Sequence, residues 1–253
     1  MLKNKPMMKP APSVQLYTVR EQIGNDMPGT LAKLVSIGFT HVELFDFVER
    51  VDEYKSALAE NNLQVTSAHA IMMGRDLSPI FKAAKSLDIN TLIDPWLPSE
   101  NWQSVEQIKE TAQKLDSIAK QAEDYGISIG YHNHNWELEN KFDGITALEI
   151  FESMLPANIV LEIDAYWAEV GGASAPEILK KFGNRVQFLH IKDGTKNGGT
   201  SAQVPAGQGE IALADVIKVA PHAAPIAEFD EYQGDIFAGL ASSLEFIKQV
   251  QGE

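Results

Sequence analysis

Two histidines and a glutamate, His132, His134 and Glu137, lie close together in a stretch that reads I-G-Y-H-N-H-N-W-E. The apolar beginning of this stretch predicts a strand, and its polar end predicts a loop. Side chains alternate along a strand, so the two imidazoles are expected on one face. Such groups are costly to bury unless something pairs with them. We therefore predict that they serve a metal site, and that other strand ends supply the remaining ligands.

Polar residues also follow the ends of the other predicted strands. In chain order they are Gln15, Tyr17, Glu43, His69, Asp94, Trp96, Asp164, His190, Lys192 and Glu228. Four of the polar strand-end residues, His132, Asp164, His190 and Glu228, end consecutive strands and offer two imidazoles and two carboxylates. This mixed set of ligands suits Mn²⁺, Fe²⁺, Co²⁺ or Zn²⁺ better than Mg²⁺. The sequence thus predicts one divalent metal ion at these four residues.

Glu162 has two possible roles in such a site. It faces the same way as Asp164, one layer deeper along the strand. It could orient a histidine ligand through a hydrogen bond, or it could form an ion pair with Lys192. Both roles stay open at the level of sequence.

The elements that must position these residues alternate between strands and helices. The strands are expected at residues 13–18, 41–45, 64–69, 91–94, 127–132, 159–164, 186–192 and 225–229. The helices are expected at residues 28–37, 51–61, 79–87, 105–125, 144–154, 176–182, 213–220 and 236–250. Strict alternation implies a parallel sheet, and eight units in 253 residues imply a closed (β/α)8 barrel, the TIM barrel. A doubly wound open sheet is the alternative, but no G-x-G-x-x-G follows the first strand. We predict one α/β barrel domain over residues 13–253 after a flexible segment, residues 1–12.

Composition excludes several classes of function. The formal net charge of −14 argues against a nucleic-acid partner and against an anionic membrane surface. The absence of Cys removes disulfides and thiolate ligands and is compatible with the cytoplasmic location that we predict. We expect no signal peptide in the first residues, and no window reaches the roughly 18 apolar residues that a membrane span needs.

At these residues the chain resembles the sugar isomerase/epimerase superfamily of xylose-isomerase-like barrels. The motifs are S-V-Q-L-Y-T-V-R, G-F-T-H-V-E-L, Y-H-N-H-N-W-E, L-E-I-D-A-Y-W, L-H-I-K-D-G, G-Q-G-E-I and A-E-F-D. Family members bind one divalent metal through Glu, Asp, His and Glu from strands five to eight. The resemblance therefore implies Asp164, His190 and Glu228 as ligands, whereas the strand-five Glu falls at His132. The first ligand is then either His132 or the nearby Glu137.

Two departures from the family pattern bear on the reaction. The D-x-x-H after strand six ends here in Trp167, and the paired glutamates of the sugar epimerases lack their strand-five member. The Y-H-N-H form looks more like the subgroup near inosose dehydratases and lyases acting on keto-sugars. His134 matches a catalytic His of related dehydroshikimate dehydratases.

The resemblance implies a metal-dependent isomerase or epimerase that removes a proton next to the carbonyl of a small keto-sugar or polyol ketone. We expect His134 to be the base, Glu137 and Lys192 to be a proton donor or a substrate clamp, and Glu228 to combine ligand and acid–base roles. The residues expected to contact the carbohydrate are Gln15, Tyr17, Glu43, His69, Trp96 and Trp167.

Two alternative functions stay open. One is a dehydratase or lyase acting on an inosose or a 3-keto-glycoside, and the other is a non-catalytic sugar-binding barrel. An abasic-site endonuclease shares the barrel, but the acidic net charge disfavours it. The long helix at residues 105–125 could support a homodimer.

Overall fold

A computed structural model describes residues 9–252, so most of the predicted flexible segment, residues 1–12, lies outside the described residues. Eight parallel strands close into a barrel in the order β1-β12-β9-β8-β5-β4-β3-β2. These strands are β1 (Ser13–Gln15), β2 (His41–Leu44), β3 (Gln64–His69), β4 (Thr91–Asp94), β5 (Ser128–His132), β8 (Val160–Asp164), β9 (Val186–Ile191) and β12 (Ala224–Ala227). The predicted (β/α)8 barrel is confirmed.

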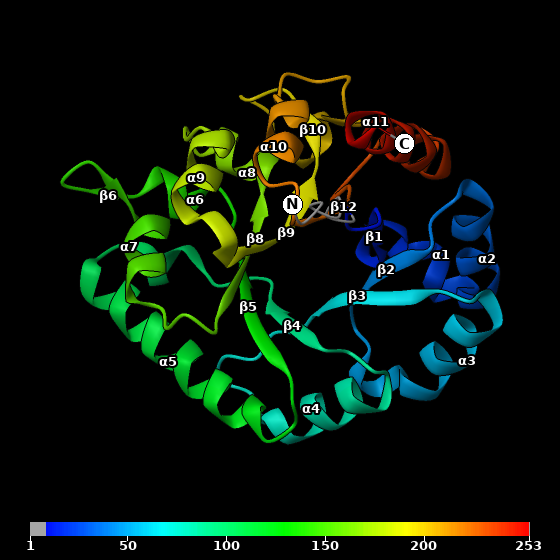
Figure 1. Ribbon diagram of the computed structural model, residues 1–253, viewed down its shortest axis with the longest axis horizontal. Coiled ribbons are helices and arrows are strands. Elements are labelled where there is room, and N and C mark those ends of the chain that lie inside the picture. Colours follow the sequence, from blue (N-terminus) through cyan, green and yellow to red (C-terminus); the bar gives the residue numbers. More distant parts are fainter. Residues whose placement is uncertain (1–8, 253) are drawn as a thin grey trace, which may run out of the picture.

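Helices surround the strands, as Figure 1 shows, and α11 packs beside α2 where the ring closes. The helices are α1 (Arg20–Asn25), α2 (Met27–Ile37), α3 (Val51–Asn61), α4 (Leu77–Ser86), α5 (Val105–Glu123), α6 (Trp136–Glu139), α7 (Ala147–Met154), α8 (Ala165–Val170), α9 (Ala175–Phe182), α10 (Leu213–Val219) and α11 (Ile236–Gln251). Each of the eight predicted helices has a counterpart. The short helices α1, α6 and α8 were not predicted; α8 follows β8 directly, whereas a 3-10 turn precedes α1 and a three-residue loop precedes α6.

Small hairpins and one short first strand also differ from the prediction. β6 (Lys141–Phe142) pairs with β7 (Ile145–Thr146), and β10 (Asp193–Gly194) pairs with β11 (Gln203–Val204). The first strand ends at Gln15 instead of Thr18, because Oε1 of Gln15 accepts a hydrogen bond from the Tyr17 N–H and starts a 3-10 turn. Tyr17 therefore lies on a turn above the barrel.

The interior of the barrel is apolar towards the amino-terminal ends of the strands and polar towards their carboxyl ends. Ile93, Phe188, Ala224 and Ile226 form a separate buried cluster between the strands. Gly130 in β5 lies against this cluster, since a Cβ added there would approach Cδ1 of Ile93 at 2.5 Å. The site is built on the next layer, towards the carboxyl ends of the strands. Among the described residues, no helix has the length and apolar character needed to cross a membrane.

Candidate metal centre

A cavity of about 820 Å³ opens at the carboxyl ends of the strands. Many of the polar residues predicted at the strand ends line it, together with residues of the βα loops. The lining includes Tyr17, His69, Trp96, His132, His134, Lys192, Glu228 and Asp230. Chemistry in TIM barrels sits at this end, so this cavity is the candidate active site.

Three of the four predicted metal ligands form one compact group. Single ligand atoms of Asp164, His190 and Glu228 all lie within 4.8 Å of one another. Nδ1 of His190 lies 2.5 Å from Oε2 of Glu228. Nε2 of His132 lies 3.7 Å from Oδ2 of Asp164, at the edge of this group. The structure thus brings the four predicted ligands together.

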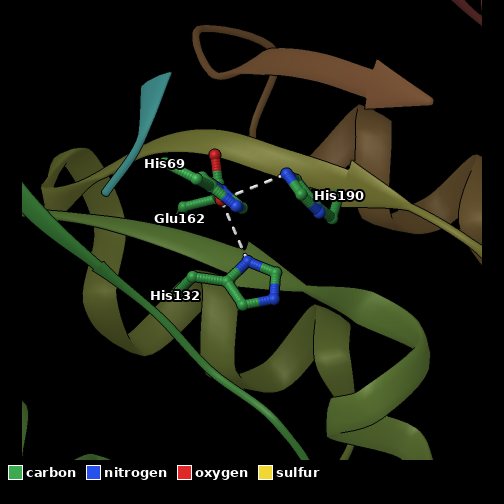
Figure 2. A group of neighbouring side chains, drawn as sticks. All are labelled: His69, His132, Glu162 and His190. Atoms are coloured by element: carbon green, nitrogen blue, oxygen red, sulfur yellow. Dashed lines mark hydrogen bonds and ion pairs between the residues drawn. The ribbon is translucent and has the colours of Figure 1, made fainter. Parts of the chain in front are cut away.

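A second group lies one layer deeper and is centred on Glu162. Its Oε1 is 2.6 Å from Nε2 of His69, 2.9 Å from Nδ1 of His132 and 3.1 Å from Nε2 of His190. Figure 2 shows the three imidazoles turned towards this carboxylate. These four residues could also hold a metal ion. Among residues 9–252 no ion pair joins Glu162 to Lys192, and its contacts with three histidines agree with the first of its two possible roles, which is to orient a histidine ligand.

Burial and neighbouring charges together set the ionisation of this deeper group. Burial alone would raise the pKa of Glu162, but the charges of His190 and His69 outweigh it and hold that pKa well below its usual range. Burial would likewise lower the pKa of His190, but Glu162, Glu228 and Glu43 hold it well above the usual value. Burial and the charge of His190 lower the pKa of His132 to about 3. His132 is therefore a neutral imidazole whose Nδ1 faces Glu162 and whose Nε2 faces Asp164.

Two predicted substrate contacts lie beneath the cavity. Gln15 and Glu43 are completely buried, and Nε2 of Gln15 donates a hydrogen bond to Oε2 of Glu43 over 2.7 Å. Glu43 also accepts a hydrogen bond from the hydroxyl of Ser67 and lies 2.7 Å from Nε2 of His190. The structure places both side chains where they support His190, away from the space that a substrate would fill.

Lys192 lies among three carboxylates. Its Nζ is 2.9 Å from Oδ2 of Asp164, 2.8 Å from Oε2 of Glu228 and 2.9 Å from Oδ2 of Asp230. Burial would lower the pKa of Lys192, but these carboxylates outweigh it and hold the pKa well above its usual value. The side chain is therefore a fixed cation at physiological pH, which suits a clamp for an anionic or polarised oxygen better than a proton donor.

His134 lines the cavity on the face that it shares with His132. Its ring stacks on Trp136, with centroids 4.6 Å apart and planes 2° apart. Its Nδ1 is buried and has no hydrogen-bond partner among the described residues. Burial, followed by the charge of His132, holds the pKa of His134 well below its usual value. The imidazole is therefore neutral, and its Nδ1 is not occupied by any hydrogen-bond donor among the described residues.

Glu137 lies away from the cavity. Its Oε1 accepts a hydrogen bond from the hydroxyl of Tyr131 over 2.6 Å, and its Oε2 accepts one from the His134 N–H over 3.0 Å. Tyr131 packs against Trp102 and Phe151, between the barrel wall and the helices. The carboxylate therefore faces the opposite side of β5 from His132.

The two tryptophans that were expected to contact the substrate lie in different environments. Trp96 lines the cavity and is 45% exposed. Trp167 is buried; its backbone N–H donates to Oδ1 of Asp164, and its Nε1 donates to Oδ2 of Asp230. Trp96 is thus placed to meet a substrate directly, whereas Trp167 braces two carboxylates.

Sequence reasoning missed Asp230 as a site residue. It lines the cavity, and it binds both Lys192 and Gln203. The signal was its spacing, because Glu228 and Asp230 are two residues apart at the end of one strand and so share a face.

The residues present fit a divalent metal ion. Oδ2 of Asp164 and Oε2 of Glu162 are buried and lack a well-directed hydrogen bond from any residue between 9 and 252, although Nζ of Lys192 lies near the Asp164 oxygen. Burial raises the pKa of Asp164 to about 6, against the effect of Lys192 and His190, so its charged form needs a cation. Buried carboxylate oxygens beside the neutral imidazole of His132 form a donor set that transition metals bind.

Three solved structures illustrate what the chain is similar to. A sugar phosphate isomerase/epimerase from Parabacteroides distasonis ATCC 8503 has a TM-score of 0.81 at 19% identity, over 96% of this chain and 95% of that one. The IolI protein with a bound zinc atom has a TM-score of 0.76 at 17% identity, over 97% and 98% of the two chains. The probable 3-DHS dehydratase AsbF from Bacillus anthracis has a TM-score of 0.70 at 14% identity, over 95% and 99%. At these identities the likeness shows the fold alone.

The family itself is shown by the sequence. No curated protein matches the chain. Residues 31–224 match the family described as "Xylose isomerase-like TIM barrel". This match spans most of the barrel, from α2 to β12. The chain therefore belongs to the xylose isomerase-like TIM barrel family.

Proposed function

We propose that this protein is a divalent-metal-dependent sugar isomerase or epimerase that removes a proton next to the carbonyl of a small keto-sugar or polyol ketone. One observation carries the proposal. Ligand atoms from Asp164, His190 and Glu228 converge at the strand ends, directly beside a cavity that His134 lines. A cation site and a neutral base in one cavity are the two parts that such a reaction needs.

The metal would be held by Asp164, His190 and Glu228, with His132 as the fourth ligand. Bound there, it would polarise the substrate carbonyl and stabilise negative charge on its oxygen. Glu162 would orient His132 and His190 through their other ring nitrogens, as carboxylates do for histidine ligands. The bound zinc in the IolI structure makes a zinc ion a reasonable first choice to test.

His134 would take the proton. Its imidazole is neutral, lines the cavity and is held in place by stacking on Trp136. Lys192 would bind a substrate oxygen through its ammonium group, and Trp96 at the rim would cover one face of the sugar. Glu137 is left out of the proton transfer because its carboxylate faces Tyr131.

Elimination is the second candidate reaction, as in a dehydratase or lyase acting on an inosose or keto-glycoside. The specific observation is the position of Lys192, 2.8 Å from Oε2 of Glu228. A fixed cation beside a carboxyl group could stabilise a departing oxygen as negative charge develops on it. The AsbF likeness concerns the fold and does not decide between the two reactions.

Hydrogen exchange tests the proposal. Zinc- or manganese-loaded protein in D₂O should introduce deuterium next to the carbonyl of at least one member of a panel of ketoses, inososes and keto-glycosides, followed by NMR. His134→Asn should slow this exchange by roughly 10²- to 10⁴-fold, the usual contribution of a general base, without changing the amount of bound metal. His41→Asn, at the opposite end of β2, is the matched control. Exchange that survives both removal of the metal and His134→Asn would refute the proposal.

A further inference from the structure

The ammonium group of Lys192 lies against two of the carboxylates that are proposed to bind the metal ion. Its Nζ is 2.9 Å from Oδ2 of Asp164 and 2.8 Å from Oε2 of Glu228. Both residues belong to the candidate metal-binding group formed with His190. The Trp167 N–H already donates to Oδ1 of Asp164, so Oδ2 is the oxygen left for a cation. The lysine and a metal ion therefore need the same atoms.

Lys192 is anchored in this position from a second side. Its side chain is only 1% exposed, and Nζ donates to both carboxylate oxygens of Asp230 over 3.0 and 2.9 Å. Asp230 is held in turn by Nε2 of Gln203 and by Nε1 of Trp167. A charge this deeply buried must stay paired. Asp230, which is not a member of the metal-binding group, offers the ammonium a partner when the other two carboxylates are taken.

We propose that Lys192 and the divalent ion compete for Asp164 and Glu228, so that Lys192 sets the affinity of the site for metal. In the metal-free protein the ammonium supplies the cation that the buried carboxylates require. When an ion binds, the ammonium withdraws towards Asp230, because two cations in contact with the same two oxygens repel each other strongly. This inference rests on the metal site of the proposed function, but it is tested on its own.

Titration calorimetry of Mn²⁺ and Zn²⁺ into chelator-stripped protein measures the competition directly. Lys192→Met should bind these ions about tenfold more tightly than the wild type, or better, because the resident cation is gone. Lys196→Met is the matched control. Lys196 pairs with Glu169 and its side chain is 46% exposed, so removing the same charge from the same loop should change the affinity by no more than about twofold. Thermal unfolding checks that each variant is folded. If Lys192→Met does not fold, Lys192→Gln replaces it in the titration.

A second variant should shift the affinity in the opposite direction. Asp230→Asn removes the charge to which the ammonium withdraws, so metal binding should weaken. A packing role for Lys192 alone would not make two contacting residues change the affinity in opposite directions.

The outcomes separate this inference from the proposed function. Unchanged or weaker metal binding by folded Lys192→Met or Lys192→Gln overturns the competition, while metal binding by the wild type still supports the proposed function. Binding by the Lys192 variants alone supports the competition and contradicts metal dependence of the natural chain. An absence of binding in every protein contradicts both.

Discussion

At the scale of single residues, the site is a set of buried charges that neutralise one another. Glu162 faces three imidazoles, and Lys192 faces three carboxylates. His190 connects the two sets, because its Nε2 faces Glu162 and its Nδ1 faces Glu228. Removing one partner from such a network leaves an unpaired buried charge, which typically costs about 3–5 kcal/mol.

Glu137 belongs to a different environment, and its role can be tested by the pH dependence of stability. Burial raises the pKa of Glu137 to about 8 from 4.5. The folded protein then retains a proton that the unfolded chain releases between those two pH values. The free energy of unfolding of the wild type should therefore fall as the pH rises through this window. Glu137→Gln cannot titrate. Between pH 5 and 8.5 its free energy of unfolding, measured with urea, should therefore fall by roughly 2–4 kcal/mol less than that of the wild type.

The neighbouring glutamate provides the control for this experiment. Glu139 is exposed and follows two residues later in α6, so Glu139→Gln should keep the wild-type pH profile. Parallel stability curves for Glu137→Gln and the wild type would show that Glu137 is ionised in the fold.

Residue types predicted the grouping of Asp164, His190 and Glu228, because each is a metal-ligating type that closes a strand. They could not predict the orientation of Glu137. Its three-residue spacing from His134 suggests proximity, but the turn into α6 directs its carboxylate to Tyr131. Only the local backbone path decides such a case.

At the scale of elements, the strand ends supply nearly all of the site. Asp164 ends β8 and also caps α8 through its Oδ1. The short helix α8 was not predicted, since α8 is shorter than two turns and follows its strand without a loop. It matters to the site, because this cap leaves the other oxygen of Asp164 facing the cations.

Strand β5 provides a test of how the layer below supports the site. A Cβ on Gly130 would lie 2.5 Å from Cδ1 of Ile93 and 2.9 Å from Cγ2 of Val160. Gly130→Ala should therefore destabilise the fold by roughly 1–3 kcal/mol in urea unfolding. Ile93→Val removes the atom in closest contact and should restore part of the loss.

A second glycine shows the opposite expectation. Gly24 lies in helix α1 with no atom within 4 Å of an added Cβ, so Gly24→Ala should leave the stability unchanged or raise it by up to about 1 kcal/mol. If Gly130→Ala proved as stable as Gly24→Ala, the packing argument for β5 would be wrong.

At the scale of the whole molecule, closing the barrel brings distant segments together. Glu43 and His190 are 147 positions apart in the chain, yet their side chains lie 2.7 Å from each other. Alternation of strands and helices predicted this closure, and the fold confirms it. The inner contacts of the polar layer could not be predicted, because they depend on the register between strands, which periodicity does not specify. The homodimer through α5 stays a prediction.

The geometry of the site predicts that the strand ends bind one divalent metal ion. The most direct test is elemental analysis of protein purified without chelators, beside the double variant Asp164→Ala/His190→Ala and the control His41→Ala. Both variants are checked for folding by circular dichroism. We expect one divalent ion per chain in the wild type and the control, and its loss from the folded double variant. Absence of metal from the wild type, even after incubation with Mn²⁺, Co²⁺ and Zn²⁺, or equal metal content in the double variant, would contradict the claim.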